Sequence, residues 1–326
     1  MRVPDEMLNC VAFVGEVTHR DSARVYGDPR ATGFFVSVPC ESPELSEMAM
    51  TYFVTAKHVA LDLKEQEICF LINRRGGGGM TVESVDGHWW FHPDDKTADV
   101  AVTQVRLPSY ADVIAISLEH FALPERLNKF HIGIGDEVFA VGLFTPAAGV
   151  ARNAPIVRHG NISMMPGEQI ETDLGYADVY LVESRSIGGI SGSPVFSRHT
   201  IAKKIQRADD TADVAFSNGP GETLLGLMHG HWDINESEMN KPYFTHDRKH
   251  GVNYGVGIVV PASKIYEALY SDGLREMRAV QEKNLVRRSV PGTDIAEPRR
   301  KEDGAAFTQN DFESALKKAS RKTERK

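Results

Sequence analysis

The chain has 326 residues, of which 41% are hydrophobic and 25% are charged. This composition supports a folded core and excludes wholesale disorder, and the length suits a two-lobed domain. No stretch approaches the roughly 18 consecutive apolar residues that a membrane-spanning helix needs. The formal net charge of −8 argues against a general nucleic-acid binder.

The cysteines and the N-terminal stretch indicate the compartment. Three cysteines, Cys10, Cys40 and Cys69, are too few for a disulfide framework in so long a chain and fit a reducing environment. The N-terminal residues place an acidic pair before the first apolar run and lack a small-residue cleavage site, so we expect no signal peptide. The sequence therefore predicts a cytoplasmic protein that has neither a membrane nor a nucleic acid as its partner.

Short apolar runs, rich in β-branched and aromatic residues, follow one another along the chain between Gly, Pro, Asn and Asp. They cover residues 8–16, 32–38, 51–55, 67–72, 80–85, 99–105, 137–143, 156–163, 179–183, 193–196, 223–228 and 254–260. This spacing predicts an all-β sandwich or barrel. Helical periodicity is weak until residues 261–272, where Ile265, Ala268 and Leu269 share one face and Pro261 suits the first helical position.

Polar and glycine-rich stretches predict the connections. Residues 74–79 predict a flexible loop, and the polar stretches 197–222 and 233–252 also predict loops. We expect one domain over residues 1–283, followed by a linker and a basic tail with a short helix over residues 284–326.

The tail differs in charge from the rest of the chain. Residues 287–326 carry 11 Lys and Arg against 7 Asp and Glu, although the whole chain is acidic. Within this tail, residues 305–326 predict an amphipathic helix with Thr308 as its N-cap, which could dock on a protein partner. The alternative is a solvated terminus.

Three short motifs stand in the order His, Asp, Ser. His58 lies just past a predicted strand in YFVTAKHVA, Asp99 heads a strand in TADVAVTQV, and Ser191 lies in the turn of IGGISGSPVF. A serine hydroxyl is a weak nucleophile until a base removes its proton, and histidine has the right proton affinity near neutral pH. A buried carboxylate fixes the histidine tautomer and stabilises the imidazolium.

The glycines around Ser191 add a second element of this chemistry. They allow a sharp turn that can aim the backbone N–H groups of Gly189 and Ser191 at a developing oxyanion. Each motif alone also occurs in ordinary strands and turns. Their order, spacing and strand context together predict a nucleophilic active site.

In these motifs the sequence resembles the chymotrypsin-like (trypsin-fold) serine peptidases, in their bacterial, disulfide-free, Deg-like form, over roughly residues 8–272. The matching segments are TGFFV (32–36), VTAKHV (54–59), ADVAV (98–102), GDEVFAVGL (135–143), LLGLMHG (224–230) and YGVGIVVPASKI (254–265). The resemblance implies two six-stranded antiparallel β-barrels, about residues 8–125 and 126–272, with the active site in the cleft between them. No peptide-binding PDZ module is expected after the second barrel.

The resemblance also implies the roles of the site residues. His58 would be the general base and then the general acid, Asp99 would orient it, and Ser191 would be the nucleophile. Gly189 and Ser191 would donate the backbone N–H groups of the oxyanion hole, and no cofactor is implied. This chain departs from the pattern at Ser193, where the family often has a glycine.

Three residues are candidates for the substrate pocket. By the resemblance, Arg185 would floor the pocket, and His229 and His231 would lie near its wall. A basic, histidine-lined pocket predicts a preference for an acidic side chain at the cleaved position. The alternative is that Arg185 turns outward or pairs with Glu183.

Four histidines also offer an alternative interpretation as a metal cluster. His229 and His231 alternate on a predicted strand, and His246 and His250 follow in a polar stretch. No cysteine lies nearby in the sequence, and polar loops often hold stray histidines. We therefore expect no metal.

The leading functional prediction is an endopeptidase that hydrolyses peptide bonds in a protein or peptide substrate through an acyl-enzyme. One alternative is a latent or inactive binding protein on a protease fold that needs a partner, because the tail and the two long polar stretches could cover the cleft. Another alternative is an esterase or acyltransferase with the same triad, which the sequence does not separate from the peptidase.

Overall fold

The computed structural model describes residues 3–20, 23–26, 29–63, 68–77, 79–83, 88–149, 152–172, 174–184, 189–198, 202–206, 212–216, 222–235 and 251–289. The chain divides into two compact units, residues 1–283 and 284–326. The tail helix predicted over residues 305–326 lies outside the described part of the chain. Among the described residues, every helix is too short or too polar to span a bilayer.

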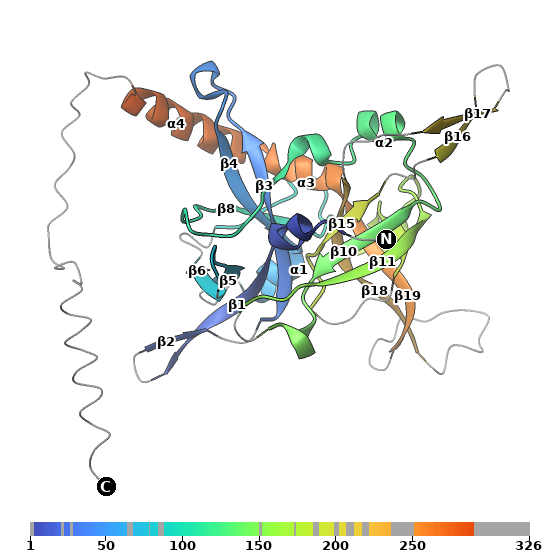
Figure 1. Ribbon diagram of the computed structural model, residues 1–326, viewed down its shortest axis with the longest axis horizontal. Coiled ribbons are helices and arrows are strands. Elements are labelled where there is room, and N and C mark those ends of the chain that lie inside the picture. The colour runs from blue at the N-terminus through green and yellow to red at the C-terminus, as the bar shows by residue number, and fades with distance from the viewer. Residues whose placement is uncertain are drawn as a thin grey trace, which may run out of the picture. The chain divides into compact units, whose positions relative to one another are not determined.

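The N-terminal half of the first unit is a nine-stranded sheet (Figure 1). Its main path is β6 (Gly79–Glu83), β5 (Ile68–Asn73), β1 (Val11–Arg20), β3 (Ala31–Pro39), β4 (Ala49–Thr55), β8 (Ala101–Gln104) and β7 (Trp90–Phe91), with β2 (Ala23–Tyr26) on β1 and β9 (Ile116–Ser117) on β3. The pairs are antiparallel except β3 with β9, which is parallel.

Buried phenylalanines fill the core of this sheet. The ring of Phe53 lies 5.2 Å from that of Phe35 and 4.1 Å from that of Phe70, measured between centroids, and all three side chains are fully buried. Gly33 makes room for Phe53, since a Cβ at this position would lie 2.1 Å from the Phe53 ring. The glycine in the TGFFV segment therefore has a packing reason.

The C-terminal half of the first unit is a closed six-stranded antiparallel barrel. Its strands run in the order β10 (Glu137–Gly142), β11 (Ile156–Met164), β14 (Tyr180–Glu183), β19 (Gly251–Pro261), β18 (Thr223–Asn235) and β15 (Pro194–Ser197), and β15 pairs again with β10. Two hairpins complete this half, β12 (Ile170–Thr172) with β13 (Gly175–Ala177), and β16 (Ala202–Gln206) with β17 (Ala212–Phe216). Closure of the barrel removes its free edges.

The mostly-β, chymotrypsin-like architecture is confirmed, and each of the predicted apolar runs contains a strand. In the described residues the nine strands of the first half form one continuous sheet. The second barrel closes as predicted.

Two stretches predicted as loops contain strands. Residues 197–222 hold the β16–β17 hairpin, and β18 and β19 extend into residues 233–252, where Asp233 pairs with Asn253. The two long strands lie side by side in Figure 1. Hydrogen bonds across a hairpin satisfy the backbone whether or not the side chains are apolar, so polarity alone did not exclude strands here.

Four α-helices and four short 3₁₀ helices connect or cover the strands. They are α1 (Lys57–Asp62), α2 (Pro124–Phe130), α3 (Ala262–Leu269) and α4 (Asp272–Ser289), with η1 (Asp5–Cys10), η2 (Pro43–Leu45), η3 (Leu118–His120) and η4 (Thr145–Ala147), as counted over the described ranges. The helix predicted over residues 261–272 is confirmed as α3. Helix α4 continues past the predicted domain boundary at residue 283 and ends at Ser289.

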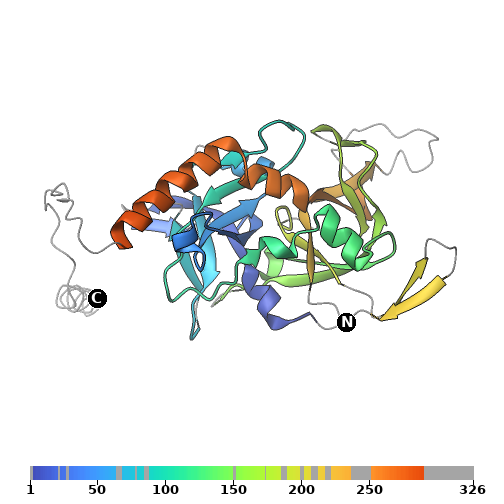
Figure 2. The ribbon, with the colours of Figure 1, turned by 90° about the horizontal axis from the view of Figure 1, so that it is seen from above.

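Helix α4 lacks the apolar stripe that would have revealed it. Leu274, Arg278 and Glu282 form its buried row, and two of these three are charged. Figure 2 shows α4 following α3 and crossing the first sheet, where Gln281 and Gln104 exchange hydrogen bonds of 2.8 Å. Hydrogen bonds between polar groups therefore help to hold this helix, which lacks an apolar face.

Candidate active site

His58 lies at the start of α1, directly after β4. Strand β4 ends at Thr55 and α1 begins at Lys57. His58 therefore lies in the first turn of the helix, where both its backbone N–H and its ring contact Asp99. The His58 N–H donates to Asp99 Oδ1 at 2.9 Å, and His58 Nδ1 lies 2.7 Å from Asp99 Oδ2. An ionised carboxylate only accepts hydrogen bonds, so Nδ1 carries the proton and Nε2 of the neutral ring is the basic nitrogen.

Asp99 is the buried centre of the site. Its side chain is 1% exposed. In the sequence Asp99 comes shortly before β8, which is paired with β4. A second imidazole contacts the same oxygen, because His229 Nδ1 lies 2.5 Å from Asp99 Oδ2. The carboxylate thus accepts from one backbone N–H and two histidine rings, which is how a buried charge is normally stabilised.

The titration of the pair follows from these contacts. Burial opposes the ionisation of Asp99, but the hydrogen bonds from His229 and His58 outweigh it and hold the pKa of Asp99 well below its usual range. Burial also disfavours the charged form of His58, but the hydrogen bond to Asp99 and its negative charge raise the pKa of the imidazole above its usual value. The site therefore combines an ionised carboxylate with a strengthened base.

Ser191 lies in the turn that leads into β15. Its hydroxyl donates to the backbone carbonyl of His229 at 3.2 Å. No hydrogen bond joins this hydroxyl to His58, although both residues are described. The His58 and His229 rings meet edge to face, with centroids 5.5 Å apart, so the serine, both histidines and the aspartate form one group.

A buried threonine connects the Ser191 turn to the first sheet. The Thr32 N–H donates to the Ser191 carbonyl at 3.1 Å, and its hydroxyl donates to the Gly189 carbonyl at 2.9 Å and accepts from the Leu143 N–H at 2.8 Å. Thr55 Oγ1 in turn donates to the Thr32 carbonyl at 2.7 Å. These bonds tie the serine turn of the second half to β3 and β4 of the first. The sequence analysis assigned no role to Thr32, because only the fold reveals its partners.

The backbone of the turn is shaped by glycines. Gly189 and Gly192 have φ values of 95° and 80°, in the left-handed region that favours glycine. A Cβ on Gly192 would lie 2.2 Å from the Thr32 carbonyl oxygen. The N–H groups of Gly189 and Ser191 donate to no group in the described part of the chain. Within the described residues, both N–H groups thus remain available as hydrogen-bond donors.

Ser193 stands where the family often has a glycine, and the structure accommodates it. Its side chain is fully buried, and its Oγ would lie 1.9 Å from a Cβ on Gly142. The glycine on β10 thus provides the space that the serine occupies. The Ser193 hydroxyl is buried and has no hydrogen-bond partner among the described residues, so Gly142 provides it with space and no polar contact.

The other sequence-predicted residues are only partly described. The His229 ring contacts the Asp99 carboxylate, and the sequence did not indicate this contact. His231 belongs to β18, where it pairs with Gly257, and Arg185 lies outside the described residues, as do His246 and His250. The preference for an acidic substrate based on Arg185 therefore stays a prediction.

His58, Asp99 and His229 could also be considered as metal ligands. One donor atom from each lies within 4.8 Å of the others. The Nδ1 to Oδ2 separations of 2.7 and 2.5 Å are shorter than the separation of about 3.3 Å between two ligands of one tetrahedral zinc ion. In the described geometry these side chains are hydrogen-bonded to one another, and a metal would have to move them apart.

The fold and the site together define the chymotrypsin-like class of architecture, with a histidine–aspartate pair beside a serine turn. No protein-family model and no curated protein matches the chain. Among solved structures, it is similar to the MamO protease domain from Magnetospirillum magneticum in its apo form, with 15% identity over 82% of this chain and 99% of that chain and a TM-score of 0.48.

Two further solved structures are similar at lower scores. The inactive form of Rv3671c from M. tuberculosis H37Rv is 14% identical over 81% of this chain and 86% of that chain, with a TM-score of 0.40. Deg5 is 16% identical over 61% of this chain and 80% of that chain, with a TM-score of 0.37. At these identities and scores the likenesses carry no conclusion about activity.

Proposed function

We propose that this protein is a serine endopeptidase that hydrolyses peptide bonds through an acyl-enzyme on Ser191. The observation that carries the proposal is the pairing of His58 with the buried Asp99 at 2.7 Å, next to a serine in a glycine turn. The N–H groups of Gly189 and Ser191, which donate to no group among the described residues, would supply the remaining element of acyl-transfer chemistry.

The residues perform acylation as follows. The Ser191 hydroxyl turns from the His229 carbonyl toward His58, and its oxygen attacks the substrate carbonyl while Nε2 of His58 takes the proton. Asp99 stabilises the resulting imidazolium, and the N–H groups of Gly189 and Ser191 stabilise the oxyanion. When the intermediate collapses, the C–N bond breaks and the imidazolium gives its proton to the leaving amine.

Deacylation repeats these steps with water in place of Ser191. His58 takes a proton from the water as its oxygen attacks the ester carbonyl, and the same N–H groups stabilise the second oxyanion. The ester C–O bond then breaks, and His58 returns its proton to the Ser191 oxygen. The products are the free acid and the restored enzyme.

Labelling with a fluorophosphonate tests the nucleophile. The probe should modify the wild-type chain at Ser191, and Ser191→Ala should abolish the labelling while the circular dichroism spectrum is unchanged. The matched control is Ser163→Ala, which removes an exposed hydroxyl from β11 of the same barrel. Labelling that persists in Ser191→Ala would refute the assignment of the nucleophile.

One observation favours a second candidate, a latent protease-fold binding protein. The Ser191 hydroxyl donates to the His229 carbonyl and makes no hydrogen bond to His58. A resting state of this kind would show no labelling alone and full labelling once a partner reorients the serine. Labelling of the isolated wild-type chain at a rate that no added protein changes would exclude this candidate.

Two further parts of the proposal concern the setting of the protein. The cytoplasmic location that we propose rests on the cysteine content. A protein partner for the basic tail rests on the charge of residues 287–326, which lie largely outside the described part of the chain. If deletion of this tail changes none of the co-purifying proteins, the proposed protein partner of the tail is refuted.

A further inference from the structure

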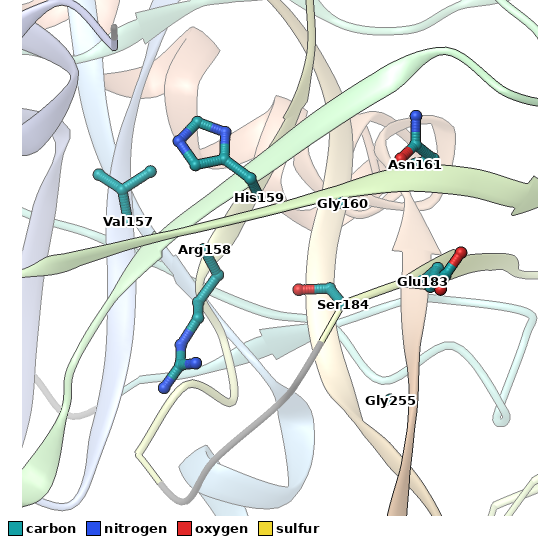
Figure 3. A pocket seen from close by; sticks show the side chains of 8 residues that line it. All are labelled: Val157, Arg158, His159, Gly160, Asn161, Glu183, Ser184 and Gly255. Atoms are coloured by element: carbon teal, nitrogen blue, oxygen red, sulfur yellow. The ribbon is translucent and has the colours of Figure 1, made fainter. Parts of the chain in front are cut away.

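A cavity of about 670 Å³ is lined by residues of the second barrel. Figure 3 shows its lining, which comes from β11, from the end of β14 and from β19. Ser184 closes one side, and its N–H donates to the Gly255 carbonyl at 2.7 Å. The cavity is thus built by strands of the barrel that also carries the nucleophile.

Arg158 supplies the charge of this cavity. In Figure 3 its side chain extends from β11 on the side toward which the Ser184 hydroxyl points, while His159 extends from the opposite side of the strand. The Arg158 Nε is buried and has no hydrogen-bond partner, and no ion pair joins Arg158 to any residue of the described ranges. A guanidinium whose Nε has no partner among the described residues, in a cavity, offers charge-assisted hydrogen bonds to an anion.

The backbone leaves space opposite this guanidinium. Gly255 has a φ of 78°, and a Cβ built on it would meet no atom within 4 Å. Gly160 lets β11 approach strand β14 closely, since a Cβ at position 160 would lie 1.9 Å from the Glu183 carbonyl oxygen. Glu183 also borders the cavity, but its carboxylate points away from Arg158 in Figure 3.

The connections of the cavity relate it to the nucleophile. Ser184 precedes Ser191 by seven positions in the sequence. Strand β19, which carries Gly255, pairs with β18, which carries the His229 carbonyl that binds the Ser191 hydroxyl. Arg158 on β11 pairs with Ala140 on β10, which in turn pairs with Val195 on β15, four positions after Ser191. The cavity and the nucleophile therefore lie on adjoining strands of one barrel.

The geometry points to this cavity as the site for an acidic substrate side chain, a glutamate or aspartate on the acyl side of the cleaved bond, held by the Arg158 guanidinium and the Ser184 hydroxyl. This inference rests on the proposed function and names its substrate class. A carboxylate accepts two parallel hydrogen bonds from a guanidinium, whereas a neutral amide accepts and donates and fits less well.

A cleavage profile tests the inference. A library of fluorogenic peptides that differ at the acyl-side residue should show kcat/KM at least about tenfold higher for Glu than for Gln, the ratio expected of one charge-assisted pair. Arg158→Gln should bring the ratio close to one, and Arg158→Glu should reverse it in favour of Lys and Arg. Arg152→Gln, which removes an exposed guanidinium from the same half of the chain, should leave the profile unchanged.

A binding measurement separates this inference from the proposed function. N-acetyl-glutamate methylamide should bind to the full-length Ser191→Ala chain in an NMR titration. Adding the change Arg158→Gln should weaken this binding at least tenfold, and so should replacing the compound by its glutamine analogue.

The outcomes distinguish the two proposals. If the wild type cleaves the library without preferring Glu, or Arg158→Gln keeps that preference, the inference is wrong and the peptidase stands. If Ser191 is never labelled but the glutamate compound binds through Arg158, the peptidase is wrong and the anion site stands. If Arg158→Gln leaves this binding unchanged, the anion site is refuted.

Discussion

His229 Nδ1 lies 2.5 Å from Asp99 Oδ2, the same carboxylate oxygen that His58 Nδ1 contacts at 2.7 Å. The two rings therefore compete for the charge of one buried aspartate. His229 also accepts the Ser191 hydroxyl at its backbone carbonyl. One residue of β18 thus contacts both the carboxylate and the nucleophile, and we treat it as a positioning residue.

The first prediction concerns this second imidazole. His229→Ala should lower kcat/KM about 10- to 100-fold, the range expected for the loss of one hydrogen bond to a charged group. Asp99 then attracts the His58 proton more strongly, so the acid limb of the pH profile should move to higher pH. His229→Asn, which places an amide donor near the position of Nδ1, should restore part of the rate and the original limb. Equal losses in both variants with an unmoved limb would reduce His229 to a packing role.

The second prediction concerns pH. Because Asp99 raises the pKa of His58, kcat/KM should rise with pH through a value above about 6.5, the usual pKa of histidine. Asp99→Asn should lower the rate by about 10⁴-fold and shift this limb to lower pH. A limb that stays in place in Asp99→Asn would show that another group controls the titration.

Stability should depend on pH through the same groups, with opposite signs. The folded pKa of Asp99 is depressed, so its contribution is present above the unfolded pKa of about 3.9 and is lost as the pH falls through the folded value. The folded pKa of His58 is raised, so its contribution is present below about 6.5 and is lost as the pH rises through the folded value. Urea denaturation of wild type and Asp99→Asn between pH 3 and 9 measures both.

The third prediction concerns Thr32. Thr32→Val keeps the shape of the side chain but removes the hydroxyl that bonds to Gly189 and Leu143. We expect the free energy of unfolding to fall by about 1–3 kcal/mol and the fluorophosphonate labelling of Ser191 to slow, because the turn loses its attachment to β3. Thr32→Ser, which keeps the hydroxyl, should label faster than Thr32→Val. If the Thr32→Val variant is labelled at the wild-type rate, the conformation of the Ser191 turn does not depend on the Thr32 hydroxyl.

The fourth prediction concerns the buried row of α4. The Glu282 carboxylate accepts from the backbone N–H groups of Glu41 at 3.0 Å and Ser42 at 2.8 Å. Glu282→Ala leaves these donors without a partner and should lower the free energy of unfolding by about 1–3 kcal/mol in urea. Glu276→Ala, an exposed change on the same helix, is the control and should stay within about 0.5 kcal/mol of wild type. Equal midpoints for the two variants would mean that α4 contributes little to the fold.

Local patterns explain why so many strands and the His, Asp and Ser motifs could be predicted. A strand in a packed sheet needs β-branched and aromatic residues at close spacing, and the run at residues 32–38 shows them within seven positions. The β16–β17 hairpin was missed because its stretch is polar and its stabilising hydrogen bonds join residues 202–206 to residues 212–216. Helix α4 was not predicted because its buried row includes Arg278, which contacts the Leu269 carbonyl and the Tyr52 ring. A charged residue at a buried position interrupts the apolar periodicity by which a helix is recognised in a sequence.

The order of amino acids by itself determined the strand-rich class, the helix at Ala262 and the motifs around His58, Asp99 and Ser191, because each depends on neighbours within a few positions. Only the tertiary structure decided that His229 contacts Asp99, that Thr32 holds the Ser191 turn, and that Arg158 lines a cavity with its Nε unpartnered among the described residues. These contacts join segments more than 20 residues apart, or depend on which way one side chain points. Chain folding sets them through packing and hydrogen-bond geometry, which no local pattern records.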